Sequence, residues 1–362
     1  MANMKLTADI TNAFGPSGYE HDVVKVIQEY TKDFDVTVDS MLNVYARLKN
    51  EQPGKPVVQL DAHSDEVGFM VQSIRANGLI NIIPIGGWVE TNIPAHTVIV
   101  KTQKGEYVKG ITYSKPPHFM SPAERSNAKV DMFDLCMDVG ASSREEVMNV
   151  YGIMPGDPIM PDVVCEYNEK TGIVMAKAFD NRIGCQCIIE TLNNVKDKKL
   201  DVTPVGAFAA QEEVGCRGAK VTAQVVNPDF AIIFEGSPAD DTVYSDGTAQ
   251  CALRSGVQIR VIDGGMISHP GLLRYAVRKA EELGIKYQIG VRRSGSTNGA
   301  VIHTTGKSVP CLVLGIPSRY AHTHYCYMAK EDLEATVALA TAVLEDLNDG
   351  TIAQILGDID QK

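Results

Sequence analysis

The feature that most constrains the fold of this chain is a change in the pattern of apolar segments between the middle of the sequence and the residues on either side of it. In residues 1–67 and 166–362, apolar runs that suit buried strands alternate with segments that suit helices. Residues 68–165 instead hold short strand-like runs separated by Gly and Pro. Strands separated by helices predict a mostly parallel sheet covered on both faces. We therefore expect a catalytic α/β domain, residues 1–67 and 166–362, interrupted by an inserted small β-barrel-like domain, residues 68–165.

The periodicity of apolar residues assigns individual elements. Residues 17–34 are expected to form a helix with one apolar face, and residues 36–48 a hairpin. Further helices are predicted within residues 183–195 and 270–284, and strands within residues 56–63, 205–211, 229–236, 257–263 and 309–317. The last helix is expected over residues 331–347, which begin with acidic residues that suit a helix N-terminus. A short helix is also expected in SREEVMNVYG of the insert.

The bulk properties exclude several classes of protein. The 362 residues are 44% hydrophobic and carry a formal net charge of −11, which argues against partners such as nucleic acid or an anionic membrane. No apolar run reaches the length of about 18 residues that a membrane span needs, and the first residues lack the apolar centre of a signal peptide. The eight cysteines form no pair of Cys-x-x-Cys motifs, which favours buried reduced thiols. We expect a cytoplasmic protein.

Polar side chains stand where four expected strands end, and Asp180 stands between an apolar strand and an apolar helix. His63 and Asp65 lie in LDAHSDEVG, Glu212 and Glu213 in FAAQEEVGCRGA, Glu235 in AIIFEG, and His322 and His324 in SRYAHTHY. Taken singly, each has an ordinary reading: a cap, a loop carboxylate or an incidental histidine. Together they are harder to dismiss, because the carboxyl ends of strands in an open α/β sheet form its ligand crevice.

Nitrogen and oxygen donors of this kind suit zinc, cobalt or manganese. The candidate ligands are two imidazoles and three carboxylates: His63, Asp180, Glu213, Glu235 and His322. One carboxylate can bridge two ions about 3.5–4 Å apart. Glu212 would then be free to act as a general base. This answers why two glutamates follow one buried strand, where their like charges would otherwise repel.

These segments resemble the M42 family of metallo-aminopeptidases, the glutamyl and leucyl aminopeptidases that form tetrahedral particles. The resemblance covers nearly the whole chain. It is carried by GPSGYE, DAHSDEVGFMV, FDNRIG, QEEVGCRGA and SRYAH in order, and by PPHFMSPAER and DVGASSREEV…GIMPGD in the insert.

The resemblance implies a role for each matching residue. His63 and Glu235 would be terminal ligands of one metal, Asp180 would bridge, and Glu213 and His322 would hold the second metal. Asp65 would orient His63, and Glu212 would be the general base. His322 matches the family histidine because it follows Arg-Tyr-x, so His324 is not chosen. Related dinuclear peptidases also imply a non-proline cis peptide between Asp180 and Asn181.

Two positions depart from the family pattern. Glu235 stands where the family often has Asp, and GSTNGA, with Asn298, stands where the family commonly has Gly-Gly-Thr-Asp-Ala. The second departure bears on substrate preference rather than on metal binding. Arg292 and Arg293 could select an acidic side chain, or could be surface or intersubunit residues.

The resemblance implies an aminopeptidase that removes N-terminal residues from short peptides, using two divalent metal ions per subunit, zinc or cobalt before manganese. It also implies a homo-oligomer, a dodecamer, in which the insert supplies contacts and lines the cavity. Two alternatives stay open: a related dinuclear amide hydrolase, such as a deacylase or carboxypeptidase, and a non-catalytic assembly protein of the same fold. A glucanase is not favoured, because no row of exposed aromatic residues is apparent and the single Trp88 lies in the insert.

Overall fold

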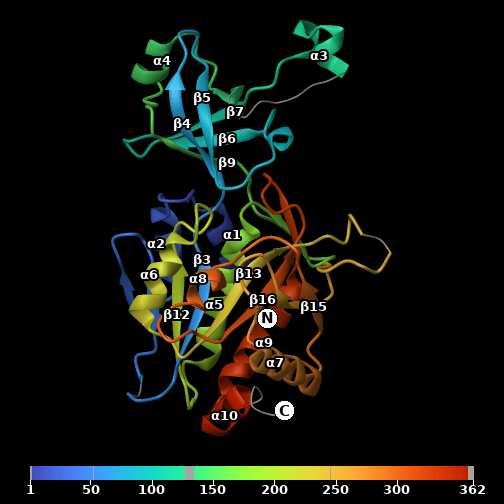
Figure 1. Cartoon of the computed structure of the whole chain (residues 1–362). Helices are drawn as coiled ribbons and strands as arrows, with labels where there is room; N and C mark the ends of the chain where they lie inside the picture. The colour runs from blue at the N-terminus through green and yellow to red at the C-terminus, as the bar shows by residue number, and fades with distance from the viewer. Residues whose placement is uncertain (1, 52, 127–133, 245, 358–362) are drawn as a thin grey trace.

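The computed structural model describes residues 2–51, 53–126, 134–244 and 246–357. An α/β body carries a separate barrel on the side where the chain leaves β3, drawn above the body in Figure 1. This confirms the predicted fold class, a mostly parallel sheet between helices with an inserted barrel. No helix in the described ranges combines the length and the apolar character needed to cross a membrane.

The body is built on an eight-stranded sheet in the order β1-β2-β12-β3-β13-β16-β14-β15. Its strands are β1 (Asp35–Val38), β2 (Val44–Arg47), β3 (Val57–His63), β12 (Thr203–Ala209), β13 (Phe230–Pro238), β14 (Val257–Ile262), β15 (Tyr287–Val291) and β16 (Cys311–Ser318). The four central strands β12, β3, β13 and β16 run parallel, whereas β2 and β14 pair antiparallel with them at either side. β12, β13 and β16 are largely apolar, as strands buried on both faces are, whereas β3 also carries the buried polar residues Gln59, Asp61 and His63.

Helices cover both faces of this sheet. One face packs against α5 (Phe179–Val195) and α9 (Lys330–Asp346), with α1 (Met4–Asn12), α2 (His21–Tyr30) and α7 (Pro270–Leu283) beside them. The other face packs against α6 (Arg217–Val226) and α8 (Gly299–Ile302). The larger apolar core lies on the α5 face, and a smaller one, rich in alanine, lies under α6 and α8.

The insert is a closed six-stranded barrel in the order β4-β5-β8-β7-β6-β9. Its strands are β4 (Gly68–Ile74), β5 (Ile80–Ile85), β6 (Thr97–Lys101), β7 (Tyr107–Thr112), β8 (Cys136–Asp138) and β9 (Pro158–Pro161). They enclose their own apolar core, in which Trp88 stacks on Phe69 with ring centroids 4.7 Å apart. The boundaries predicted at residues 67/68 and 165/166 bracket these strands but stay a prediction.

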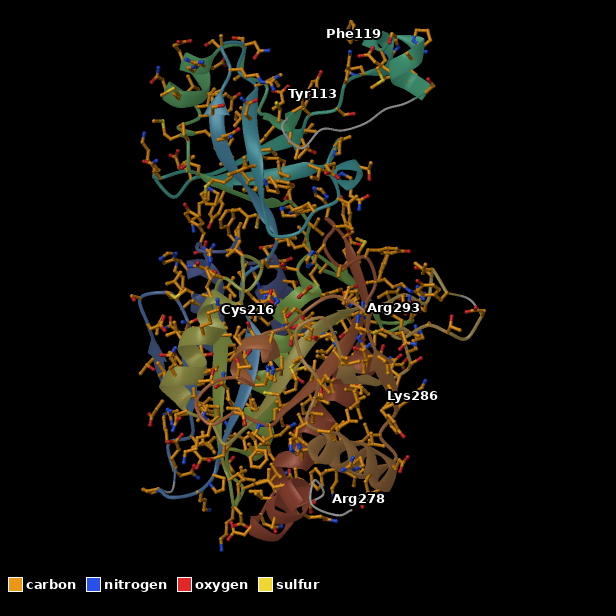
Figure 2. The ribbon with its side chains drawn as sticks, in the orientation of Figure 1. Tyr113, Phe119, Cys216, Arg278, Lys286 and Arg293 are labelled. Atoms are coloured by element: carbon orange, nitrogen blue, oxygen red, sulfur yellow. The ribbon has the colours of Figure 1, made fainter. Side chains whose placement is uncertain are left out.

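The segments between the barrel strands form short helices: the 3-10 turns η1 (Glu90–Asn92) and η2 (Pro117–Phe119), and the helices α3 (Pro122–Ser126) and α4 (Arg144–Asn149). Helix α4 falls in the predicted SREEVMNVYG segment. Helix α3 sits on an arm that projects away from the barrel, and Phe119, which precedes α3 on this arm, leaves 75% of its surface exposed (Figures 1 and 2). The described residues therefore leave an apolar side chain on the arm largely uncovered.

The structure corrects one expected boundary and adds elements that periodicity did not predict. Helix α9 is not the last, because α10 (Asp349–Gly357) follows it. The strands β10 (Glu166–Asn168), β11 (Ile173–Ala176) and β17 (Cys326–Ala329) form a small second sheet. Three- or four-residue strands carry too few residues for a period to show, and β17 joins this sheet by pairing with the distant β11. The predicted cis peptide between Asp180 and Asn181 is confirmed.

Candidate metal centre

The predicted site residues meet at one edge of the central sheet. His63 ends β3, Glu212 and Glu213 follow β12, and Glu235 lies in the C-terminal half of β13. The parallel register places Ala209 beside His63 and Glu235 beside Gly315 of β16, the strand that leads to His322. Parallel strands deliver their carboxyl ends to the same edge, so residues far apart in sequence converge there.

Asp180, at the start of α5, lies between the two histidines. Its Oδ1 is 3.0 Å from His63 Nε2, and its Oδ2 is 3.3 Å from His322 Nε2. Glu213 Oε2 lies 3.5 Å from the same His322 nitrogen. His63, Asp180 and Glu213 offer ligand atoms that all lie within 4.8 Å of one another. The structure thus gathers four of the five predicted ligands around Asp180.

Glu235 is held slightly apart from this group. Its Oε2 accepts a hydrogen bond from Asn181 Nδ2 at 3.1 Å, and the same nitrogen donates to the carbonyl of Phe234. Asn181 Oδ1 in turn accepts from the backbone N–H of Gly236. Asn181 thereby ties the start of α5 to the end of β13. Glu235 is nearly buried and lines the same cavity as Asp180 and Glu213.

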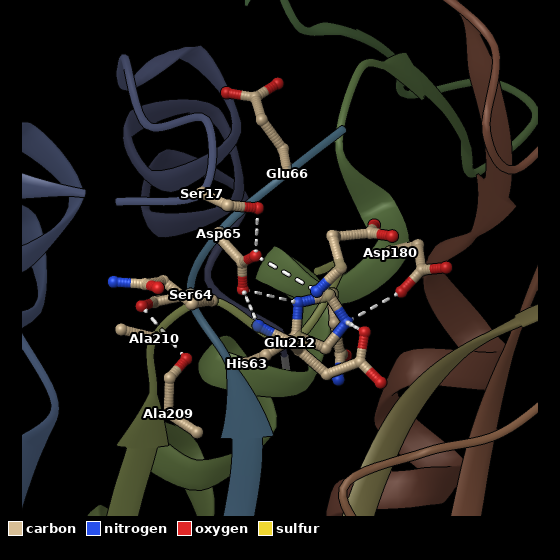
Figure 3. A network of polar contacts seen from close by, with 12 residues as sticks. Ser17, His63, Ser64, Asp65, Glu66, Asp180, Ala209, Ala210 and Glu212 are labelled. Atoms are coloured by element: carbon tan, nitrogen blue, oxygen red, sulfur yellow. Dashed lines mark hydrogen bonds and ion pairs between the residues drawn. The ribbon is translucent and has the colours of Figure 1, made fainter. Parts of the chain in front are cut away.

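Asp65 is the hub of the polar network drawn in Figure 3. Its Oδ1 lies 3.2 Å from His63 Nδ1 and accepts the backbone N–H of Glu212 at 2.9 Å. Its Oδ2 accepts from the hydroxyl of Ser17 at 2.6 Å and from the backbone N–H of Glu213 at 3.1 Å. One carboxylate therefore lies within ion-pair distance of the histidine ring and also fixes the loop that carries both glutamates, a second contact that the sequence did not reveal.

The electrostatics of the cluster suit a cation. Burial, together with the charge of Asp180, raises the pKa of both Glu213 and Glu235 well above the usual range. Burial alone would lower the pKa of His63 and of His322, but the neighbouring carboxylates raise both, that of His322 to about 10. Glu213 Oε1 is buried with no hydrogen-bond partner among the described residues. An unpaired buried oxygen beside imidazole and carboxylate donors fits a divalent metal ion.

Glu212 differs from its neighbour. Its Oε2 lies 3.8 Å from His63 Nε2, and its Oε1 accepts from the thiol of Cys216 at 3.2 Å. Burial raises the pKa of this carboxyl above its ordinary value. The side chain borders the cavity next to the donor cluster, where a proton acceptor can reach a bound molecule.

The cavity that these residues open into has a volume of about 530 Å³. Asp180, Glu212, Glu213, Glu235 and His322 line it on the side of the donor cluster, and Arg260 and Arg292 also belong to its lining. Sequence reasoning had considered Arg292 but missed Arg260. The available signal was an arginine in the middle of the otherwise apolar strand VQIRVID.

Two residues weighed from the sequence lie outside this cavity lining. His324 is buried in the contact between body and barrel, where its ring stacks on His96 with centroids 4.0 Å apart and lies against Trp88. Asn298 is also buried, and its Nδ2 donates to Asp61 Oδ1 at 2.7 Å. Asn298 thus contacts a carboxylate behind the site rather than the cavity.

Comparison with known proteins bears on this geometry directly. The model of the M42 glutamyl aminopeptidase family matches residues 43–339, which is most of the chain. This chain belongs to the M42 family of metallo-aminopeptidases. The glutamyl aminopeptidase of Lactococcus lactis subsp. cremoris (strain MG1363) is 29% identical to this chain over 96% of this chain and 97% of its own length. The lysyl aminopeptidase of Pyrococcus furiosus is 30% identical to this chain, and the alignment covers 96% of this chain and 98% of the relative.

Solved structures of TET peptidases superpose closely on this chain. The TET aminopeptidase of a marine sediment archaeon, Thaumarchaeota archaeon SCGC AB-539-E09, has a TM-score of 0.92 and 33% identity, covering 97% of this chain and 99% of its own. The structure of PhTET1, a dodecamer, has a TM-score of 0.83 and 28% identity, covering 96% of this chain and 100% of its own. M42 membership implies divalent metal ions, and His63, Asp180 and Glu213 form a group that can bind one.

Proposed function

We propose that this chain is a dinuclear metal-dependent aminopeptidase that removes N-terminal residues from short peptides. The observation that carries the proposal is the position of Asp180, whose two oxygens face two different histidines at 3.0 and 3.3 Å. A carboxylate presented in this way suits the bridging position between two ions. His63 and Glu235 would hold one ion, and Glu213 and His322 the other.

Bound there, two divalent ions would polarise the scissile carbonyl and lower the pKa of a water molecule. Zinc or cobalt fits the mixed imidazole and carboxylate donors, and manganese is the next choice. The remaining steps fall to the chain's own residues. Asp65 keeps the His63 ring oriented through Nδ1 and holds the backbone of Glu212 and Glu213 in place.

Glu212 would act as the general base. Its Oε1 is engaged by the Cys216 thiol, so Oε2 is the oxygen left to take a proton from the attacking water. The same carboxyl would then return the proton to the leaving amine as the peptide bond breaks. The acidic residues around the cavity favour the free α-ammonium group of a peptide, which would restrict cleavage to the first residue.

The decisive assay uses aminoacyl p-nitroanilides with and without a blocked α-amine. We expect metal-dependent release of nitroaniline from free-amine substrates, and at least about 100-fold less from their N-acetyl counterparts, because acetylation removes the charge that the site recognises. Faster cleavage of the blocked substrates would instead indicate a deacylase or another amide hydrolase. Failure to bind any ion after reconstitution would favour a non-catalytic assembly protein.

We also propose a large homo-oligomer, a dodecamer, with residues 68–165 as the inserted domain that supplies contacts. The dodecamer of the similar protein PhTET1 supports this, as does the exposed Phe119 on the arm that projects from the barrel. Light scattering on the purified protein is expected to give a mass near twelve times 39.3 kDa. A fully active, stable monomer at working concentration would contradict the assembly. The eight unpaired cysteines suit the reducing cytoplasm, where we place the protein.

A further inference from the structure

The loop between β5 and η1 of the barrel reaches the candidate metal centre of the body. The carbonyl oxygen of Gly87 accepts a hydrogen bond from His322 Nδ1 at 2.8 Å. A methyl group added at Gly87 would lie 3.1 Å from the same nitrogen. At the preceding Gly86, it would lie 3.3 Å from Glu213 Oε2 and 2.7 Å from a side-chain carbon of Val67. The backbone of the two glycines therefore packs directly against two candidate ligands.

These two ligands belong to the same proposed metal ion. Glu213 and His322 would hold one ion, whereas His63 and Glu235 would hold the other. The polar contacts of His63 and Glu235 described above all lie within the body. The barrel thus borders the position of one ion, and the position of the other is built from the body.

The Gly87 carbonyl sets the direction of the His322 ring. A carbonyl oxygen only accepts hydrogen bonds, so Nδ1 carries a proton and Nε2 is the nitrogen that can bind a metal. This Nε2 faces Asp180 Oδ2 at 3.3 Å and Glu213 Oε2 at 3.5 Å. Metal-binding histidines usually donate their second ring nitrogen in this way, which fixes the tautomer and orients the ring.

The loop that carries His322 is strained and is held by the barrel at a second point. Tyr320 and His322 have φ values of 62° and 60°, a left-handed conformation that is unfavourable for residues with a side chain. The His322 side chain is 39% exposed, so packing alone restrains it weakly. Further along the loop, the buried ring of His324 stacks on His96 of the barrel and lies 5.1 Å from Trp88, measured between ring centroids.

The core of the barrel fixes the position of the Gly87 carbonyl. Trp88 directly follows Gly87, is 9% exposed and stacks on Phe69 inside the barrel. Ile85, the last residue of β5, precedes the two glycines and is also buried. The short segment between these two buried side chains has little freedom to move away from the metal centre.

We propose that the inserted barrel completes the metal position of Glu213 and His322, with Gly87 as the positioning residue. The inference rests on the proposed function, which makes His322 a metal ligand. It gives the barrel a task besides supplying contacts in an oligomer. Of the two ions, the one at His322 then depends on the barrel.

The test titrates the metal-free protein with Zn²⁺ in competition with a chromophoric chelator, which measures the affinity of each ion. Gly87→Ala pushes a methyl group toward His322 Nδ1 and should raise one dissociation constant by about tenfold or more, the usual effect of disturbing the outer partner of a metal-binding histidine. The affinity for the other ion should stay within about threefold of the native value, because its ligands contact the body. His322→Ala removes the ligand itself, should weaken the same ion, and so identifies it.

Gly105→Ala is the matched control within the barrel. Gly105 lies in the turn between β6 and β7 with a φ of 82°, so alanine strains the backbone there. The added methyl group would meet no atom of the described residues within 4 Å. Both Zn²⁺ dissociation constants should stay within about twofold of the native values. Equal weakening by Gly105→Ala and Gly87→Ala would overturn the positioning role, because any damage to the barrel would then suffice.

A second pair of variants tests the other contact between the loop and the barrel. His324→Ala removes the ring that stacks on His96, whereas His324→Phe keeps an aromatic ring there. In the cobalt-loaded protein, the visible absorption bands report the ligand geometry of each ion. We expect Gly87→Ala and His324→Ala to change the bands that His322→Ala changes, and His324→Phe to stay closer to the native spectrum. Native spectra and native Zn²⁺ affinities in Gly87→Ala and His324→Ala would overturn the proposal.

The metal measurements separate this proposal from the proposed function. If Gly87→Ala weakens one of two bound ions but the native protein cleaves no aminoacyl substrate, the aminopeptidase function fails and the role of the barrel holds. If substrates are cleaved and Gly87→Ala binds both ions as tightly as the native protein, only the role of the barrel fails. A native protein that binds a single ion would overturn both.

Discussion

Glu212 and Glu213 are adjacent in the chain but have different surroundings. Glu213 lies beside His322 and has a buried oxygen without a hydrogen-bond partner, whereas Glu212 is held by the Cys216 thiol and lies next to His63. Asp65 fixes the backbone of both. The two carboxylates are therefore separable by experiment, because a base and a ligand fail in different ways.

Replacing Glu212 by Gln keeps the shape of the side chain and removes its ability to accept a proton. We expect kcat to fall by at least about 100-fold, the lower range for a positioned general base. Both ions should remain bound, because Glu212 is not proposed as a ligand. Metal content by plasma emission spectrometry and turnover are measured on the same samples.

Glu213→Gln is the matched counterpart, with the same change of atoms one position further along. Loss of an anionic ligand should weaken the binding of one of the two ions. The metal content should therefore fall, and excess metal should partly restore activity. If Glu212→Gln loses metal while Glu213→Gln keeps both ions, the two roles are exchanged. If neither variant changes turnover, the paired carboxylates are structural.

At the scale of elements, a buried charged triad joins the segments behind the metal site. Glu66, just after β3, accepts from Lys177 Nζ at 2.6 Å and from Arg182 NH2 at 3.1 Å. Arg182, in α5, also donates to the carbonyls of Ile10, Ala13 and Gly15. All three charged side chains are at most 2% exposed. The triad therefore links α1, β3 and α5 through residues next to Asp65 and Asp180 in the chain.

Lys177→Met tests this link. Removing one partner of a buried ion pair typically costs about 3–5 kcal/mol of unfolding free energy, although Arg182 remains to share the charge of Glu66. We expect a lower midpoint of denaturant unfolding, followed by far-ultraviolet circular dichroism. Lys198→Met, which breaks an exposed pair with Glu345, is the control and should change the free energy by about 0.5 kcal/mol or less. Equal effects of the two substitutions would contradict a structural role for the triad.

At the scale of the whole molecule, the metal site makes stability depend on pH. Folding raises the pKa of His63 and of His322, and it raises the pKa of Glu213 and Glu235 well above 4.5. At any pH between the pKa of the unfolded state and the higher pKa of the folded state, each group therefore binds more protons in the folded state. In that window the free energy of unfolding decreases as pH rises.

For the metal-free protein we expect the free energy of unfolding to decrease from pH 6.5 to pH 8, by an amount of order 1 kcal/mol from His63 alone. Groups with the opposite shift act elsewhere: the pKa of Lys177 falls to about 8 and that of His324 to about 3, so their windows lie above and below this range. Saturating zinc should raise the midpoint of denaturant unfolding, because an ion binds the deprotonated ligands. For the same reason it should reduce or reverse the decrease of the unfolding free energy with pH. Rising stability in the metal-free protein over this range would refute the coupling.

Much of the fold and of the site can be predicted from the sequence because the signals are local. The largely apolar sequences of β12, β13 and β16 specified these strands, and the polar residues Glu212, Glu235 and His322, which lie at or after their ends, marked the site edge. The order of motifs then identified the family. Short elements were missed: β10 and β11 form a local hairpin of three- and four-residue strands, too short for a period to show, and β17 pairs with β11 from a segment remote in the chain.

The sequence alone determined which residue types are available to a metal and which strands deliver them, since strand ends and buried runs follow from the hydrophobic pattern. Only the tertiary structure decided their contacts. It placed both histidines next to Asp180, gave Asp65 three partners besides His63, and paired Arg260 with Asp263. The physical reason is that charge balance in a buried site depends on distances between segments remote in sequence, and a linear pattern does not encode those distances.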